Sequence, residues 1–480
     1  MPHPEVMDSM RASRRSVLKA TVGILLTIVL ASTSRAGAQT RTADEQEFLD
    51  VYRELVEINT TDSVGDNTKA AEAMAARLRA AGFPAADVQV LAPHPRKGNL
   101  VARLGGTGPG KPLLLLAHID VVEARREDWS TDPFTLLEKD GYFYGRGTSD
   151  DKAMAAIFVD LFVHLKREGF KPARDIILAL TADEELGSSS PYNGVRWLLA
   201  NHRSLIEAGM VLNEGGGGEL RGGRHLVNRI QTSEKVPLSF RLEVTNAGGH
   251  SSRPTKDNAI YQLAEGLIKL SKYEFPVRMN DATRLYFERS ATLQTGQLAD
   301  DMRAVARSTP DPEALARLST DSLYNPLLRT TCVPTRLEGG HASNALPQMA
   351  RSVVNCRILP DHPVGEVQRT LAQVIGPPVT VTPMGEAFNS PPSPLDADLM
   401  AQVERITSEM WPGTLVIPSM GTGATDSRWL RAAGFPSYGV SGLFLGESRA
   451  HGRDERIGVK DLYAGRQFLD RLVRELAAKP

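Results

Sequence analysis

Acidic and histidine residues follow three short hydrophobic segments of this 480-residue chain. Segment and residues pair as follows: Pro112–Ala117 with His118 and Asp120, Asp175–Ala182 with Asp183, Glu184 and Glu185, and Met210–Asn213 with Glu214. Imidazole and carboxylate groups are ligands of divalent metals, zinc in particular. The chemistry that these residues suggest first is therefore that of a metal-dependent hydrolase.

Short apolar segments between polar turns are typical of buried strands in a parallel sheet. Helical patterns alternate with them over residues 44–57, 68–81, 154–167 and 193–200, which predicts βαβ units. In such open sheets, ligands bind beyond the carboxyl ends of the strands. We therefore expect an α/β fold, a mostly parallel sheet flanked by helices, with the acidic and histidine residues at one edge.

Spacing separates the candidate residues into roles. His118 and Asp120 lie one residue apart, so a strand directs both to one side, where one can bind a metal and the other orient it. Glu184 and Glu185 are adjacent and diverge, so one can be a ligand and the other a general base. Asp150, in a glycine-rich turn before a helix, and the distant His451 are further candidates.

The pattern changes near residue 236. Strands at 237–245, 331–337, 350–359 and 379–382, with helices at 257–270 and 364–375, predict a small α+β domain of ferredoxin-like type. We expect this domain, residues 236–388, to be inserted between two parts of a catalytic domain, residues 39–235 and 389–480. Residues 275–325 form a polar, helical insertion within it.

Composition excludes some classes of partner. Hydrophobic residues make up 41% of the chain and charged residues 24%, and the net charge is −1, so nothing indicates nucleic-acid binding. The N-terminus pairs Arg14 and Arg15 before an apolar segment and Ala36-Gly37-Ala38, which predicts a twin-arginine export signal over residues 1–38. We expect a periplasmic or secreted protein with no stable membrane association, the alternative being an uncleaved anchor.

In combination, these motifs resemble the zinc-dependent metallopeptidase family that includes glutamate carboxypeptidase, succinyl-diaminopimelate desuccinylase, aminoacylase and carboxypeptidase S. The resemblance covers residue 44 to the C-terminus. It rests on the sequences 117–120, 145–152, 183–185, 214, 249–251, 344–347, 355–357 and 451–452. Segments 329–332 and 355–357 are most similar to the carboxypeptidase S and N-acyl-amino-acid hydrolase branch.

The resemblance implies a site with two zinc ions sharing a hydroxide, although the donors also suit Co²⁺ and Mn²⁺. It implies that Asp150 bridges the ions and that the Asp150–Asp151 peptide is cis. The remaining implied roles are His118 and Glu214 on one ion, Glu185 and His451 on the other, Asp120 orienting His118, and Glu184 as general base.

The resemblance also implies roles for residues of the inserted domain, which would act as a lid and as a dimerisation surface. His250 would stabilise the oxyanion from a partner subunit, Arg357 would hold a substrate carboxylate, and Asn344 would add a polar contact. The alternatives are a surface turn histidine for His250 and an exposed strand pair for Arg357 and Asn344. The insertion at residues 275–325 puts the homodimer, and the action of His250 in trans, in question.

Three other segments lead to minor expectations. We expect Cys332 and Cys356 to be buried free thiols, the alternative being a disulfide between two neighbouring strands in an oxidising periplasm, and neither has the spacing of a zinc site. Gly105–Lys111 is similar to a phosphate-binding loop, but Pro112 and a strand follow it, so we expect a hairpin loop and no nucleotide. Gly421–Ser427 either lines the pocket or is a plain loop, and Asp426 is not taken as a site residue.

Together these features predict an exported zinc-dependent amidohydrolase. It would cleave an amide next to a free carboxylate, in a peptide or an N-acyl amino acid. A dipeptidase or another small-amide deacylase is the alternative among enzymes. A non-catalytic metal-binding or peptide-binding protein on the same fold is the alternative of another class.

Overall fold

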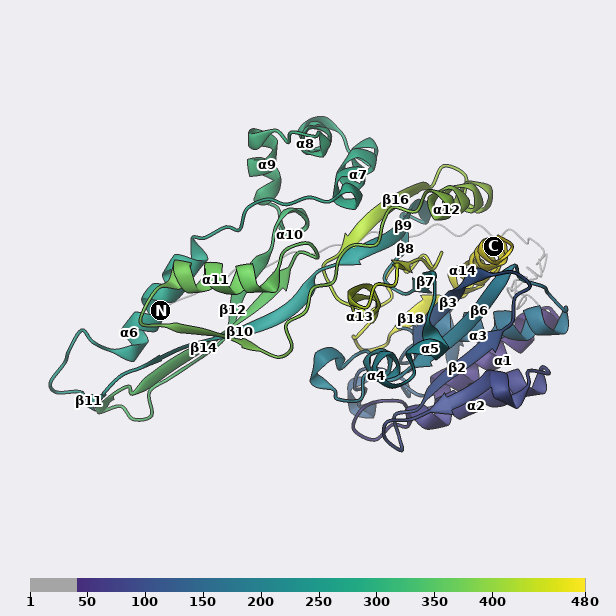
Figure 1. Ribbon diagram of the computed structural model, residues 1–480, viewed down its shortest axis with the longest axis horizontal. Coiled ribbons are helices and arrows are strands. Elements are labelled where there is room, and N and C mark those ends of the chain that lie inside the picture. Colours follow the sequence, from purple (N-terminus) through teal and green to yellow (C-terminus); the bar gives the residue numbers. More distant parts are fainter. Residues whose placement is uncertain (1–40, 480) are drawn as a thin grey trace, which may run out of the picture. The chain divides into compact units, whose positions relative to one another are not determined.

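The computed structural model describes residues 41–479 (Figure 1). The export signal predicted at residues 1–38 lies outside this range, so the structure does not bear on it. Within residues 41–479, no helix has both the length and the apolar character needed to cross a membrane.

The larger domain is built around a mixed sheet that comprises nine strands in the described part of the chain. The strand order is β1-β2-β6-β3-β7-β17-β9-β16, and β8 pairs with β9. The strands are β1 Val88–Leu91, β2 Asn99–Leu104, β3 Gly110–His118, β6 Arg174–Thr181, β7 Met210–Asn213, β8 Gly217–Arg221, β9 Arg224–Glu234, β16 Leu415–Gly421 and β17 Ser437–Gly439. The central strand β3 pairs in parallel with both β6 and β7, so the carboxyl ends of these three strands meet at one edge.

Helices cover both faces of this sheet because successive side chains of its strands point in opposite directions. In β3, Leu113 and Leu115 join the core beneath one helical layer, whereas Leu114 and Leu116 join the core beneath the other. The first layer contains α1 Ala43–Glu57, α2 Asn67–Ala80, α3 Lys152–Arg167, α12 Ala397–Met410 and α14 Val459–Ala477. The second contains α4 Gly194–Asn201, α5 Arg203–Ile206 and α13 Ser427–Ala432.

The expected hairpin after β2 is wrong. The segment Gly105–Lys111 does connect β2 to β3, but β6 lies between these two strands and pairs with both. A loop that leads to a non-adjacent strand can have the same composition as the loop of a tight hairpin. Only the strand pairing distinguishes the two.

The smaller domain is an antiparallel sheet of strand order β12-β14-β10-β15 with two helices on it, as predicted (Figure 1). Side chains of alternate β10 residues, such as Leu238, Phe240 and Leu242, form a separate core with the helices. The elements are β10 Val236–Thr245, α6 Ala259–Ser271, β12 Thr331–Gly339, β14 Met349–Ile358, α11 Val364–Ile375 and β15 Thr380–Met384. Beyond the Thr245 end of β10, β11 Gly249–His250 pairs with β13 Ala345–Leu346.

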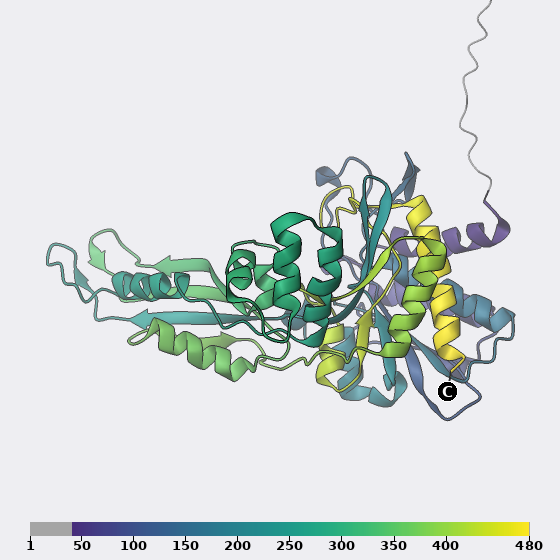
Figure 2. The same cartoon turned by 90° about the horizontal axis from the view of Figure 1, so that it is seen from above.

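The insertion within the smaller domain forms a helical cluster with its own core (Figure 2). Its helices are α7 Asp281–Ser290, α8 Gly296–Ala306, α9 Pro312–Ser319 and α10 Asn325–Leu328. The cluster contacts the larger domain, because Arg289 of α7 donates hydrogen bonds to Glu404 and to the carbonyl of Val416 on β16. The insertion therefore covers the β16 edge of the large sheet.

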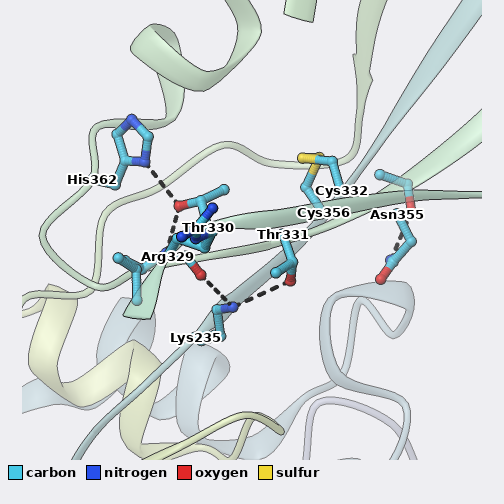
Figure 3. Close-up of a disulfide and its surroundings, with 10 residues drawn as sticks. Lys235, Arg329, Thr330, Thr331, Cys332, Asn355, Cys356 and His362 are labelled. Atoms are coloured by element: carbon cyan, nitrogen blue, oxygen red, sulfur yellow. Dashed lines mark hydrogen bonds between the residues drawn. A yellow bond between two sulfur atoms is a disulfide. The ribbon is translucent and has the colours of Figure 1, made fainter. Parts of the chain in front are cut away.

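The expectation of free thiols is wrong, because Cys332 and Cys356 form a disulfide (Figure 3). The register of β12 and β14 places the two residues directly opposite each other, with their Cα atoms 4.0 Å apart. The sequence identified both strands but not their register, and the register decides whether the two sulfur atoms meet.

A small sheet of strand order β18-β5-β4 joins distant parts of the chain. Its strands are β4 Leu137–Lys139, β5 Tyr142–Tyr144 and β18 Arg456–Gly458. Because β5 directly precedes the glycine-rich turn and β18 directly follows the loop of His451, this pairing brings the turn and the loop together.

Candidate metal centre

The acidic and histidine residues predicted from the strand ends lie together at one edge of the large sheet. His118 is the last residue of β3, Glu184 and Glu185 follow β6, and Glu214 follows β7. Ligand atoms of His118, Asp150 and Glu185 lie within 4.8 Å of one another, as do those of His118, Glu184 and Glu214. The parallel pairing of β3 with its neighbours is what produces this convergence.

Asp150 lies between the two histidines. Its Oδ1 is 3.1 Å from Nε2 of His118, and its Oδ2 is 3.2 Å from Nε2 of His451. On the first side, Oε1 of Glu214 is 3.7 Å from His118, and on the second, Oε2 of Glu185 is 3.0 Å from His451. One carboxylate thus separates two half-sites, each completed by a histidine and a glutamate.

This donor set fits a pair of divalent cations. Imidazole nitrogens and carboxylate oxygens are ligands of zinc and of similar transition metals. Burial raises the pKa of Glu214 well above its usual value, and the nearby carboxylates of Glu184 and Asp150 raise it further. Positive charge in the site would relieve this repulsion between carboxylates.

Glu184 is separate from these two pairs. Its carboxylate lies in the group of His118 and Glu214, and burial, followed by the charges of Asp426 and Asp120, raises its pKa well above the usual value, against the effect of His118. The side chain also lines a pocket of about 410 Å³ that contains Asp150. A carboxylate beside the ligands and open to the pocket is placed as a general base requires.

Asp120 does more than the spacing suggested. Its two carboxylate oxygens accept hydrogen bonds from the backbone N–H groups of Glu184 and Glu185, both at 3.1 Å. The ring of His118 is oriented mainly by the backbone carbonyl of Asp120, 3.0 Å from Nδ1, whereas the carboxylate is 3.5 Å away. Asp120 therefore positions two parts of the site, the loop after β6 and the imidazole of His118.

The turn that carries Asp150 is held by a buried residue that the sequence did not single out, Glu455. Its carboxylate accepts hydrogen bonds from the backbone N–H groups of Gly147, Ser149 and Asp150, and it pairs with Arg146 at 2.7 Å. Its position four residues after His451 was the available signal. The peptide between Asp150 and Asp151 is cis, as the resemblance implied.

The residues predicted in the smaller domain do not lie together. Arg357 lines the pocket of Glu184, whereas His250 and Asn344 are exposed and lie outside its lining. Arg357 pairs with Pro237 at one end of β10, and β11 lies beyond Thr245 at the other end. At about 3.3 Å per residue, this strand separates His250 from Arg357 by roughly 25 Å or more.

The segment Gly421–Ser427 lies at the pocket, since Gly423 and Ala424 line it. Asp426 is buried and accepts a hydrogen bond from Asn193 at 2.8 Å. Arg428, directly after this segment, also lines the pocket and was missed by the sequence analysis. The available signal for Arg428 was a basic residue directly after a loop rich in Gly, Thr and Ser. The local sequence does not show that this side chain is buried or that it lines the pocket.

We predict that metal binding releases protons. Burial lowers the pKa of His118, but its hydrogen bonds to Asp120 and Asp150 outweigh this, and hydrogen bonds to Asp150 and Glu185 raise the pKa of His451 to about 10. Both rings are therefore cationic in the metal-free protein at neutral pH, whereas coordination requires them neutral. Zinc binding should release about two protons from the imidazoles and any proton that Glu214 retains because of its raised pKa, and zinc affinity should rise with pH. Calorimetry in buffers of different ionisation enthalpy measures this, and release near zero would contradict it.

We also predict that Glu455→Gln weakens metal binding and destabilises the fold. The change leaves the buried Arg146 without its counterion, which typically costs about 3–5 kcal/mol, and loosens the turn of Asp150. Urea unfolding and zinc titration measure the two effects. Glu447→Gln is the matched control, because this exposed glutamate of the same loop pairs with Arg456 at the surface. Equal zinc affinity in both variants would be inconsistent with a role for Glu455.

Comparison with known proteins agrees with this geometry. Residues 114–475 match the model of Peptidase family M20/M25/M40. The chain is 31% identical over 373 residues to the N-fatty-acyl-amino acid synthase/hydrolase PM20D1 of Xenopus tropicalis, covering 76% of this chain and 72% of the relative. It is 28% identical over 367 residues to a probable carboxypeptidase S-like protein of Dictyostelium discoideum (73% and 69%) and 27% identical over 452 residues to aminoacylase-1B of Rattus norvegicus (91% and 97%).

Solved structures share the fold. An M20 family metallo-carboxypeptidase of Sulfolobus solfataricus superposes with a TM-score of 0.66 at 18% identity, covering 89% of this chain and 98% of the other. The YXEP protein of Bacillus subtilis, described as a dinuclear metal-binding peptidase, gives 0.57 at 12% identity, covering 91% and 99%. The expected resemblance, including its carboxypeptidase S and N-acyl-amino-acid hydrolase branch, is confirmed. The chain belongs to the M20/M25/M40 family and is a metallohydrolase of its peptidase and amidohydrolase type.

Proposed function

We propose that this protein is an exported di-zinc hydrolase of N-acyl amino acids, cleaving the amide next to a free carboxylate. The observation that carries the proposal is the position of Asp150 between two histidines, with Glu184 beside them in a pocket that also contains Arg357. The names of the relatives, N-fatty-acyl-amino acid hydrolase, aminoacylase and carboxypeptidase S-like, point to the same class of amide.

In this proposal, His118 and Glu214 would hold one ion, Glu185 and His451 would hold the other, and Asp150 would be shared between them. Bound divalent ions would lower the pKa of water and polarise a substrate carbonyl. Glu184 takes a proton from the attacking water, whose oxygen adds to the carbonyl carbon. When the C–N bond breaks, Glu184 returns the proton to the amine nitrogen, and a carboxylic acid and a free amino acid leave.

The same proposal includes a homodimer through the smaller domain. Strand β12 is an edge strand, and its residues from Val333 to Gly339 are exposed. Apolar side chains gather next to it, including Leu337 (69% exposed), Tyr261 (58%) and Ile260 (44%). An open edge beside an apolar surface favours pairing with a second copy. The helical insertion covers β16 instead, so the β12 edge stays free.

The dimer would also account for the distance of His250 from the pocket of its own chain. A second subunit can bring its own His250, with Asn344, to a pocket whose described lining includes no histidine of the smaller domain. There the imidazole would stabilise the developing oxyanion.

Glu184→Gln should reduce turnover by about 100-fold to 10,000-fold while leaving bound zinc unchanged, because only the proton acceptor is removed. Release of amino acid from a panel of N-acyl amino acids, dipeptides and longer peptides measures turnover, and elemental analysis measures zinc. Glu447→Gln is the exposed control. Cleavage restricted to dipeptides would favour a dipeptidase, and no cleavage by the zinc-loaded protein would favour a non-catalytic binder.

His250 in trans predicts complementation between two inactive variants. Co-expression of Glu184→Gln and His250→Ala chains should restore about a quarter of wild-type activity, because half of the dimers are hybrids with one intact site. Leu337→Asp should shift the mass in solution to that of a monomer. Activity that stays at the level of the separate variants would mean that His250 does not act across the interface.

Export is proposed from the N-terminal residues alone. Replacing Arg14 and Arg15 by Lys should retain the protein in the cytoplasm, because the twin-arginine route requires the arginine pair. Fractionation and N-terminal sequencing of the exported protein measure this, with cleavage expected after Ala38. Unchanged export of the Lys variant would exclude that route.

A further inference from the structure

Arg428, the second residue of α13, is a buried cation without a counterion. Arg428 is only 5% exposed, and its Nε has no hydrogen-bond partner. No carboxylate in the described part of the chain forms a salt bridge with it. Other buried arginines are paired: Arg146 with Glu455 at 2.7 Å and Arg431 with Glu234 at 3.3 Å. Because an unpaired buried charge is costly, Arg428 calls for an anion that the chain does not supply.

The nearest acidic group does not take that place. The charge of Arg428 lowers the pKa of Asp426, so the two residues are close. The carboxylate of Asp426, however, faces Asn193 at 2.8 Å and Thr181 at 3.3 Å. The guanidinium of Arg428 instead contacts an aromatic ring: its carbon lies 4.9 Å from the centre of the Trp429 ring. An aromatic face only partly replaces a counterion.

The guanidinium end of Arg428 lies at the catalytic loop. A Cβ atom added to Gly187 would be 2.6 Å from Nη2 of Arg428, so the guanidinium lies directly over this backbone. Gly187 also has a φ of +51°, which other residues rarely adopt. The same loop carries Glu184 and Glu185, and Arg428 lines the pocket with both of them.

A second guanidinium faces the same pocket from the other domain. Arg357, near the end of β14, lines it and forms no salt bridge with any described residue. Burial lowers its pKa, and the positive charge of Arg428 lowers it further, so the two guanidinium groups repel each other. The nearby Lys235 is not a counterion for Arg357, because it is itself basic. Its amine donates hydrogen bonds to the carbonyl of Arg329 and to Thr331 (Figure 3).

We infer that Arg428 and Arg357 together bind the carboxylate of the substrate, one from each domain. This rests on the proposed function, in which that carboxylate belongs to the amino-acid half of an N-acyl amino acid. Two guanidinium forks suit the two oxygens of a carboxylate, and the anion removes the repulsion between them. Arg428 thereby becomes a substrate-positioning residue, which places the adjoining amide at Glu184.

A neighbouring pocket offers a different role for Arg428. It is lined by Ser188, Ser239, Asn355 and Met384, and Arg428 borders both pockets. There the guanidinium would select an acidic side chain of the amino acid and would leave its α-carboxylate to Arg357. In the first role, Arg428 contributes to binding of every substrate with a free α-carboxylate. In the second, it contributes only when the amino acid has an acidic side chain. One experiment therefore distinguishes the two roles.

The experiment measures binding in the zinc-loaded Glu184→Gln protein, in which turnover is suppressed. Calorimetry with N-acetyl-L-methionine, N-acetyl-L-methioninamide and N-acetyl-L-glutamate gives three affinities. Arg428→Gln should weaken binding of N-acetyl-L-methionine about tenfold or more and leave its amide unchanged. Arg428→Lys should recover part of the loss, and it also serves if the Gln variant does not fold.

Arg196→Gln is the matched control, because Arg196 lies over the same Trp429 ring but pairs with Glu386 outside the pocket of Glu184. Equal binding of acid and amide by the parent protein, or equal losses for both in Arg428→Gln, would overturn the inference. A loss confined to N-acetyl-L-glutamate would assign Arg428 to the side chain and would also overturn it. Failure of the proposed function would show separately, as absence of turnover with Glu184 intact.

Discussion

The position of one carboxylate determines the rest of the site. Asp150 faces His118 with one oxygen and His451 with the other, although these histidines are 333 positions apart along the chain. That position depends on Glu455, which binds three backbone N–H groups of the turn from the loop that also carries His451. The turn and the loop are therefore positioned as one unit, and the spacing of the two half-sites follows from it.

Concentrated negative charge is the second constraint. The parallel ends of β3, β6 and β7 bring Glu184, Glu185 and Glu214 next to Asp150, and burial raises the pKa of Glu184 and of Glu214 well above the usual value. Such a cluster is stabilised by cations, which is the physical basis for a metal centre at this edge. The pocket that these carboxylates line is also lined by Arg357 and Arg428, which form no salt bridge with any described residue. Metal ions bound by the carboxylates, together with the two guanidinium groups, would suit a substrate that carries a carboxylate.

The sequence predicted those parts of the structure that depend on local pattern. The apolar segments before His118, Glu184 and Glu214 encode strands, and parallel strands place their ends together, so most of the metal centre was predictable. Strand β9, Arg224–Glu234, was not predicted. It is rich in polar residues and has no apolar pattern typical of a strand, although most of it is buried. The disulfide and the burial of Arg428 depend on register and tertiary packing, which no local pattern contains.

Anomalous X-ray scattering from crystals grown with zinc tests the central claim most directly. The account predicts two peaks, one on each side of the Asp150 carboxylate, the first beside His118 and Glu214 and the second beside His451 and Glu185. The expected separation is about 3.5–4 Å, as in other two-metal hydrolases. A single peak, or peaks that do not share Asp150, would contradict the bridged pair and the division of roles between the two adjacent glutamates.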